Sequence, residues 1–268
     1  MKKKLLTAIT AILCLYGFSQ QKEGKVIYER SMQMQMSIDD NGQGAQDILR
    51  TRTDKFELLF GNNQALWQLS DQETPAEEGP GGGVQIRMFG GGTDDISFYD
   101  LTKGTSTEQR EMFDKKFIIT DSIKKMNWKL TGETKTILSH VCQKATSQRI
   151  GVRMTMNMDN GKMERKEVSD TTALIAWFTP DIPVASGPAE YQGQLPGLIL
   201  EMDLNNGKQI FKATEISAKA DIASIKEPKS GKKVTRTEFR KETQKMMEEM
   251  EKNNGGGGSG NRTIRISN

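Results

Sequence analysis

Cysteine and histidine are scarce in this chain of 268 residues, which contains only Cys14, Cys142 and the single histidine His140. We expect Cys14 to be removed with an N-terminal leader, so Cys142 remains alone and no intramolecular disulfide can form. Nucleophilic and metal sites usually bring cysteine and histidine together from distant segments. The sequence therefore shows no recognisable catalytic site, and we expect neither an enzyme nor a bound cofactor.

Long apolar runs are absent after the first twenty residues. The chain starts with lysines at positions 2–4, continues with apolar or small residues from Leu5 to Phe18, and then reaches Ser19. This pattern is typical of a signal peptide, and its apolar part is too short for a hydrocarbon core of about 30 Å. Leu13 stands where a lipobox requires a small residue, which disfavours lipidation of Cys14. We expect cleavage after Ser19 and export to the periplasm or the outer membrane.

The chain also lacks an excess of one charge. It has 38 basic and 35 acidic residues, and three of the lysines lie in the predicted leader, which leaves 35 of each in the mature protein. A nucleic-acid-binding protein carries a basic surface, so this balance excludes nucleic acid as a partner. No later segment approaches the roughly 18 apolar residues of a membrane helix, so we expect no transmembrane segment in the mature chain.

Period-two alternation of apolar residues is the main pattern that is present, and it predicts β-strands. It is clear at Val26, Tyr28 and from Met32 to Ile38. An Asp, Asn and Gly-rich turn at 39–44 joins that strand to a second one through residues 48–60. Asn-Gly turns predict two more hairpins. Their strands are 152–158 with 163–168, and 198–204 with 209–216, while further strand-like runs are 108–113, 117–121, 127–130 and 136–146.

Two regions break this pattern. Residues 71–92 form a glycine-rich, mildly acidic insertion that predicts a loop, and residues 239–253 have the spacing of an amphipathic helix. We predict an all-β fold, an antiparallel and strongly curved sheet that forms a sandwich or half-barrel, with one C-terminal amphipathic helix. The expected divisions are a signal peptide at 1–19, a β domain at 20–236, and a C-terminal part at 237–268 with the helix, a Gly linker at 255–258 and a short strand at 263–267.

A motif with a defined order of residues lies in the second half of the chain. Ala176 to Pro183 reads AWFTPDIP, and it is followed by Ser186-Gly187-Pro188 and by Leu195 to Glu201, which reads LPGLILE. Upstream, the run from Lys135 to Ala145 ends in Cys-Gln-Lys-Ala. With these motifs in this order, the chain resembles the GLPGLI family of exported bacterial cell-envelope proteins.

The resemblance has one departure, because Gln194 stands where the name motif has its first glycine and Gly193 comes one position earlier. Residues 154–168 also look like a hairpin inserted between the two family motifs. The resemblance implies a location in the envelope and, as partners, TonB-dependent outer-membrane transporters. It implies no specific activity.

The motif residues predict a structural role, in which they shape the turns between strands. Prolines cannot donate to a sheet ladder, and Pro196-Gly197 suits a type II turn that starts the next strand. The alternative is a docking surface, since loops held by a scaffold often carry function. The residues concerned are Trp177, Pro180, Pro183, Gly187, Pro188, Leu195, Pro196, Gly197, Leu198 and Ile199.

Methionines align on two predicted strands, which leaves three interpretations open. Methionine fills irregular cores and adaptable apolar surfaces, and its thioether also binds Cu(I). The stripes therefore predict core packing, a groove for an apolar ligand, or a copper site. The copper candidates are Met32, Met34, Met36, Met154, Met156 and Met158, with His140 and Cys142.

Three functions follow from these patterns. The first is an accessory protein of the envelope that docks to an outer-membrane TonB-dependent transporter. The second is a carrier that holds a lipid or other apolar ligand on a methionine-lined sheet face. The third is a copper-binding protein or an unrecognised hydrolase, for which a dyad of His140 and Cys142 is the candidate.

Overall fold

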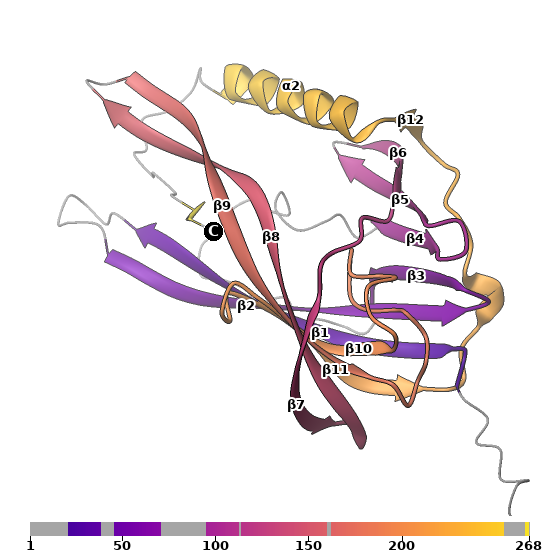
Figure 1. Ribbon diagram of the computed structural model, residues 1–268. Coiled ribbons are helices and arrows are strands. Elements are labelled where there is room, and N and C mark those ends of the chain that lie inside the picture. Colours follow the sequence, from indigo (N-terminus) through magenta and orange to yellow (C-terminus); the bar gives the residue numbers. More distant parts are fainter. Residues whose placement is uncertain are drawn as a thin grey trace, which may run out of the picture.

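The computed structural model describes residues 21–38, 46–70, 95–112, 114–159, 162–254 and 266–267. The predicted signal peptide, the turn at 39–44, the glycine-rich insertion and the Gly linker lie outside this part. The described residues form one sheet that is open at both edges, with an α-helix near the C-terminus (Figure 1). This confirms the predicted all-β class, as a single curved sheet rather than a sandwich.

The sheet contains thirteen strands, and the three predicted hairpins are all present in it as β1–β2, β8–β9 and β10–β11. Its path runs β12-β6-β5-β4-β3-β2-β1-β11-β10-β9-β8-β7, and β13 pairs with β1. The strands are β1 (Gly24–Ile38), β2 (Gln46–Gly61), β3 (Gln64–Leu69), β4 (Ile96–Asp100), β5 (Thr105–Met112), β6 (Lys115–Ser122), β7 (Lys129–Ile137), β8 (His140–Asp159), β9 (Lys162–Thr179), β10 (Leu198–Leu204), β11 (Gln209–Ser217), β12 (Lys232–Val234) and β13 (Ile266–Ser267).

Three local predictions need correction. Residues 136–146 were expected to form one strand, but Leu138 and Ser139 adopt φ of 46° and 68° and make a tight turn between β7 and β8. Neither residue is the glycine or asparagine that marks such turns. The hairpin at 154–168 is no separate insertion, because it is the far end of β8 and β9. One pair, β12 with β6, is parallel.

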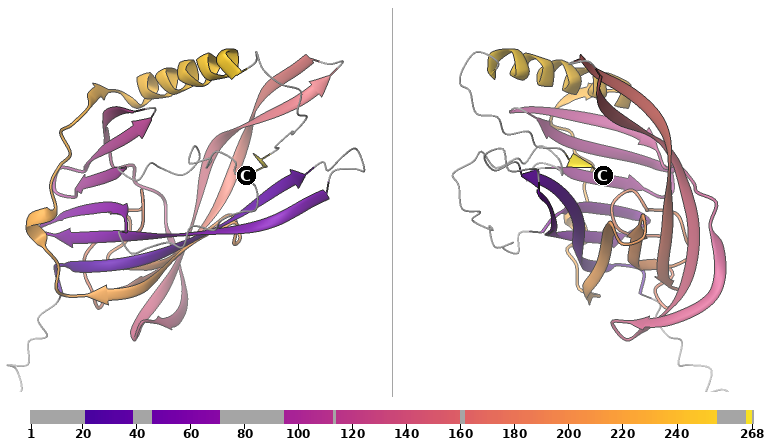
Figure 2. Two further views of the ribbon diagram at one scale, coloured as in Figure 1. Left: turned by 180° about the vertical axis from the view of Figure 1, so that it is seen from behind. Right: turned by 90° about the vertical axis from the view of Figure 1, so that its left-hand side faces the viewer.

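The curvature of the sheet follows from a short connection. Ten strand spacings separate β6 from β7 along the sheet, which would be about 48 Å in a flat sheet. The chain joins Ser122 at the end of β6 to Lys129 at the start of β7, and seven residues reach at most about 25 Å. The sheet must therefore curl until its two sides approach each other, as the views in Figure 2 show.

The inner face of this curl holds the main core. Alternate residues of β1, β2 and β3, among them Tyr28, Phe56 and Trp67, point to it and are buried. On the opposite face a smaller cluster of Leu59, Leu66 and Phe98 is covered by Ile225, which follows the short 3-10 helix Ile222–Ser224. A sheet covered on both faces explains why β4 is buried almost throughout and why four successive residues of β5 are buried.

The helix α2 (Arg236–Asn254) begins at the β6 edge and runs across the open side of the curl (Figure 1). Its first turn is capped by Thr235, whose hydroxyl accepts from the Glu238 amide while the Glu238 carboxylate accepts from the Thr235 amide. Phe239 packs edge-on against Phe117 of β6. Among the described residues, no helix is long and apolar enough to span a membrane.

Candidate functional site

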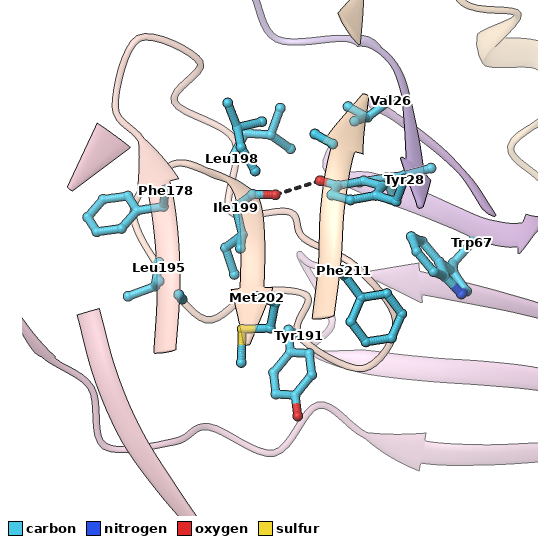
Figure 3. Packing of buried hydrophobic residues seen from close by; sticks show 14 of the residues in the cluster. Val26, Tyr28, Trp67, Phe178, Tyr191, Leu195, Leu198, Ile199, Met202 and Phe211 are labelled. Carbon is cyan, nitrogen blue, oxygen red and sulfur yellow. Dashed lines mark hydrogen bonds between the residues drawn. The ribbon is translucent and has the colours of Figure 1, made fainter. Parts of the chain in front are cut away.

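The motif loop, defined as residues 180–197, packs against the inner face, and most of the motif is buried. Gly187, Pro188, Leu195, Gly197, Leu198 and Ile199 are buried, whereas Pro180, Pro183 and Pro196 are exposed. The Tyr28 hydroxyl donates to the Ile199 carbonyl over 2.6 Å and ties β1 to the motif (Figure 3). These contacts favour the architectural interpretation for the buried members.

Gly197 is required by its surroundings. A Cβ placed there would lie 2.2 Å from the Thr179 carbonyl oxygen and 3.1 Å from a Phe178 ring carbon. Backbone atoms cannot rotate away as a side chain can, so only glycine allows β10 to start beside the end of β9. The motif glycine therefore sets how closely these two strands approach.

Gln194, the position where the motif departs from its family pattern, holds the connection between β6 and β7. Its amide oxygen accepts from the Met126 backbone amide over 3.1 Å, and its amide nitrogen donates to the Lys124 carbonyl over 2.9 Å. The Lys125 ammonium also donates to the Gly193 carbonyl. Glutamine thus fixes the segment 123–128, which crosses the inner side of the curl.

Trp177 is half-buried, lies on the strand face opposite to that of Ala176 and Phe178, and packs against the margin of the main core cluster. The Lys135 ammonium lies 4.3 Å from its ring centroid and also pairs with Glu201 over 2.7 Å. This outer position differs from the buried one expected for a core tryptophan.

A hollow of about 640 Å³ opens on the inner face. Arg30 of β1, Arg110 of β5 and Arg149 of β8 all line it, so strands from both halves of the sheet contribute to one space. Lys124 and Met126 of the crossing segment form part of its wall. Its size falls in the range of about 300–1,000 Å³ that is usual for small-molecule sites.

Phe56, Trp67 and Phe211 form the floor of this hollow, and the fully buried Tyr28 packs beside Trp67. Trp67 stacks on Phe56, with centroids 5.0 Å apart and planes 10° apart. Phe211 meets Trp67 edge-on at 5.9 Å, and Tyr28 lies 5.5 Å away (Figure 3). Aromatic faces of this kind offer a broad apolar surface to a flat or apolar molecule.

The wall beside β1 and β2 is cationic. The Arg30 guanidinium binds one oxygen of Asp54 at 2.6 Å, and Arg52 binds the other oxygen at 2.8 and 3.0 Å. Arg30 also lies over the Phe56 ring, 4.8 Å from its centroid. Two guanidinium groups thus share one carboxylate.

The wall beside β5 and β6 holds a network in which each carboxylate has a partner. Glu108 accepts from Arg110 at 3.0 Å and from Arg236 at 2.5 Å, and Arg110 also binds Asp95 at 2.9 Å. Burial alone would raise the pKa of the Glu108 carboxyl, but the two arginines together hold that pKa below its usual value. Arg236 also binds Asp121 at 3.2 Å, so this network fixes the start of α2 to the sheet.

The structure separates the copper candidates. Strands β11, β10 and β9 lie between β1, which carries Met32, and β8, which carries Met154. Along β8, Cys142 precedes Met154 by twelve residues, which is about 40 Å of extended strand. The side chains of Met34, Met36, Met154, Met156 and Met158 are outside what the structure describes. In its described part, no three His, Cys, Asp or Glu side chains gather as a metal site.

His140 and Cys142 also fail to form a dyad. The Cys142 thiol donates to the backbone carbonyl of His140 at 3.6 Å, while the His140 ring lies 3.5 Å from the Asp181 carboxylate. Burial raises the pKa of the Cys142 thiol to about 11. A thiol of this kind is protonated near neutral pH and is a weak nucleophile.

The residues that line the hollow were not singled out from the sequence. A signal for Arg30 was present, since it follows Val26 and Tyr28 on the same strand face and places a charge at an inward position. Trp67 could have been found from the alternation of Ala65, Trp67 and Leu69. The ion pairs of Glu108 with Arg236 join residues far apart in the chain, and no local pattern indicates them.

Comparison with known proteins gives a family resemblance over part of the chain. Residues 128–201, from the start of β7 to β10, match a family described as a protein of unknown function (Porph_ging). No curated protein matches the chain.

Two solved structures of PNGF-II, in the C2 and P21 space groups, are similar at 16% identity with TM-scores of 0.46 and 0.45. They cover 80% and 81% of this chain. This chain spans only 32% of each of theirs.

Proposed function

We propose that this chain is a non-enzymatic, exported protein of the bacterial cell envelope, of the GLPGLI type, that binds a small molecule with an apolar body in its inner hollow. The proposal combines the predicted leader, the motif from Ala176 to Glu201 and the partial match to an uncharacterised family. The ligand surface differs from the methionine-lined face expected from the sequence, because aromatic rings form the floor of the hollow.

The single observation that carries the proposal is the aromatic floor around Trp67. Trp67, Phe56 and Phe211 are core residues with 7%, 8% and 3% of their surfaces exposed, and they border a hollow of about 640 Å³. Such a concave, partly apolar space with a few polar groups is typical of a ligand site. The raised pKa of the Cys142 thiol, and its hydrogen bond to the His140 carbonyl, support a role without catalysis.

Titration with N-phenyl-1-naphthylamine, an uncharged dye, tests this function. We expect one dye molecule per protein, with quenching of tryptophan fluorescence by energy transfer. The Trp67→Leu variant should bind at least about tenfold more weakly, since about 1.4 kcal/mol changes a binding constant tenfold. Trp177→Leu is the matched control, because Trp177 is not among the residues that line the hollow. Equal dye binding by both variants would contradict the assignment.

A second function is favoured by a separate observation. Within the segment that matches the family, Ile150 is 80% exposed and lies on the part of β8 that extends beyond its pairing with β7. A strand edge of this kind offers backbone donors and acceptors to another chain. We therefore also propose the accessory role, in which this edge of the sheet contacts a TonB-dependent outer-membrane transporter.

Crosslinking in cells followed by affinity purification tests the accessory role. A transporter recovered with the wild type should be lost from the double variant Ile150→Pro, Val152→Pro, since proline removes the backbone donors of this edge. The variant Lys229→Ser, at an exposed polar position outside the matched segment, should retain it. Recovery that is unchanged in the double variant would exclude this surface as the interface.

A further inference from the structure

Arg30 is a charged residue in a row of inward-facing apolar ones. It follows Val26 and Tyr28 on the inner face of β1, and only 9% of its surface is exposed. Burial of a charge is costly unless partners compensate for the lost hydration. The charges and hydrogen bonds around Arg30 therefore indicate the charge of a ligand that fits the hollow.

The partners of Arg30 leave a positive charge uncompensated. Both oxygens of Asp54 are occupied, one by Arg30 and one by Arg52. One carboxylate thus faces two guanidinium groups, and this trio carries a formal charge of +1. Because Arg52 is more exposed, water screens its charge better than that of Arg30.

One donor of Arg30 is also unused. Its Nε is buried and has no acceptor among the residues that the structure describes. A buried N–H without an acceptor costs roughly 1–3 kcal/mol. Arg30 lines the hollow, so the guanidinium that carries the uncompensated charge borders the space that a ligand would occupy.

On the opposite wall, beside β5 and β6, the carboxylates are already paired with arginines, so this wall does not favour a bound cation. Glu108 is bound by Arg110 and Arg236, and Asp95 accepts from Arg110 and from the Glu111 backbone amide. These carboxylates are already neutralised within the protein. The asymmetry between the two walls therefore favours a ligand with a negative group.

We propose that the ligand is an amphipathic organic anion, whose carboxylate, phosphate or sulfonate binds Arg30 while its apolar or aromatic body lies against Trp67. This inference rests on the proposed ligand-binding function and adds the chemical class of the ligand. Hydrogen bonds between charged groups are the strong ones in proteins, and the low polarity around Trp67 strengthens them further.

Two dyes with related bodies test the inference on the purified exported protein. The anionic dye 8-anilinonaphthalene-1-sulfonate carries the body of N-phenyl-1-naphthylamine with an added sulfonate. We expect the anionic dye to bind at least about tenfold more tightly, since a hydrogen bond to a charged group contributes about 1.5–3 kcal/mol. The variant Arg30→Gln should lose this preference and keep its affinity for the uncharged dye.

Arg50→Gln is the matched control, because it removes an exposed arginine charge from β2 at a residue outside both the hollow and the two ion pairs of Asp54. It should keep the preference for the anionic dye. Should Arg30→Gln fail to fold, Arg30→Lys replaces it, because lysine retains the charge and removes the guanidinium donors. We expect Arg30→Lys to show a weaker preference for the anionic dye than the wild type. The ¹⁵Nε resonance of Arg30 in the wild type should also shift on addition of the anionic dye alone.

The outcomes distinguish a failure of the anion assignment from a failure of the proposed ligand-binding function. If both dyes bind in a manner that depends on Trp67 but neither Arg30 variant changes the preference, the anion assignment is wrong and the ligand site remains. If neither dye depends on Trp67, the ligand site itself is wrong. Displacement of the anionic dye by free laurate indicates a soluble anion, whereas displacement by phosphatidylglycerol vesicles indicates a lipid headgroup, and either result supports the inference.

Discussion

Replacement of Gly197 by alanine should destabilise the fold strongly. The added Cβ would lie 2.2 Å from the Thr179 carbonyl oxygen, where ordinary van der Waals contact begins near 3.4 Å. The strands β9 and β10 pair at this point, Leu198 opposite Thr179, so relief requires that one strand move by about 1 Å. Overpacking costs about 1–3 kcal/mol where side chains can adjust, and a rigid backbone contact belongs at the upper end.

The expected loss is therefore about 3 kcal/mol, which lowers Tm by about 6–12 °C in a protein of this size. Gly151→Ala is the control, because it lies in β8 with nothing within 4 Å of the added Cβ. Its Tm should stay the same or rise slightly, since glycine weakens a strand. Calorimetry of both variants measures the difference. Equal Tm values would refute the claim that the motif glycine sets the approach of β9 and β10.

Three further outcomes are expected. Trp67→Ala should cost about 3–5 kcal/mol in chemical denaturation, and Trp177→Ala clearly less because its ring is half-exposed; the reverse order would contradict their placement. Because the folded pKa of Glu108 lies below its unfolded value, its contribution to stability is present above about pH 4.5 and lost as pH falls through the folded pKa. Hydrogen exchange should thus show the first turns of α2 losing protection as the pH falls through the lowered pKa of Glu108, and Arg236→Gln should lose it already at pH 7. Cys142 should resist iodoacetamide at pH 8 in the native protein and react fully in urea, whereas rapid native labelling would contradict its burial and raised pKa.

Local patterns were sufficient for three of the hairpins and for the helix. Alternation from Val26 to Ile38 and the two Asn-Gly turns predicted hairpins that the structure contains, because these signals depend on neighbouring residues alone. The turn at Leu138-Ser139 was missed for the same reason. Its residues carry no turn signal, and pairing of β7 with β8 forces them into the left-handed region.

The hollow could not be predicted in this way because it depends on the curl of the whole sheet. The short connection from Ser122 to Lys129 brings β6 and β7 together, and only then do Arg110 and Arg149 line one space. The methionine alternation predicted a ligand surface, but the single inward charge at Arg30 is the more informative signal for a site. A charged residue in a row of inward apolar residues departs from the usual strand pattern, since a buried charge needs a specific partner.

The most direct test of the ligand site is native mass spectrometry of the protein purified from its own envelope, followed by solvent extraction. The account predicts one small molecule per wild-type protein, with an apolar body, that is absent from a folded Trp67→Leu variant and retained by Trp177→Leu. A wild type that carries the same molecules as Trp67→Leu, or none, and that also fails to bind the uncharged dye would contradict the central claim.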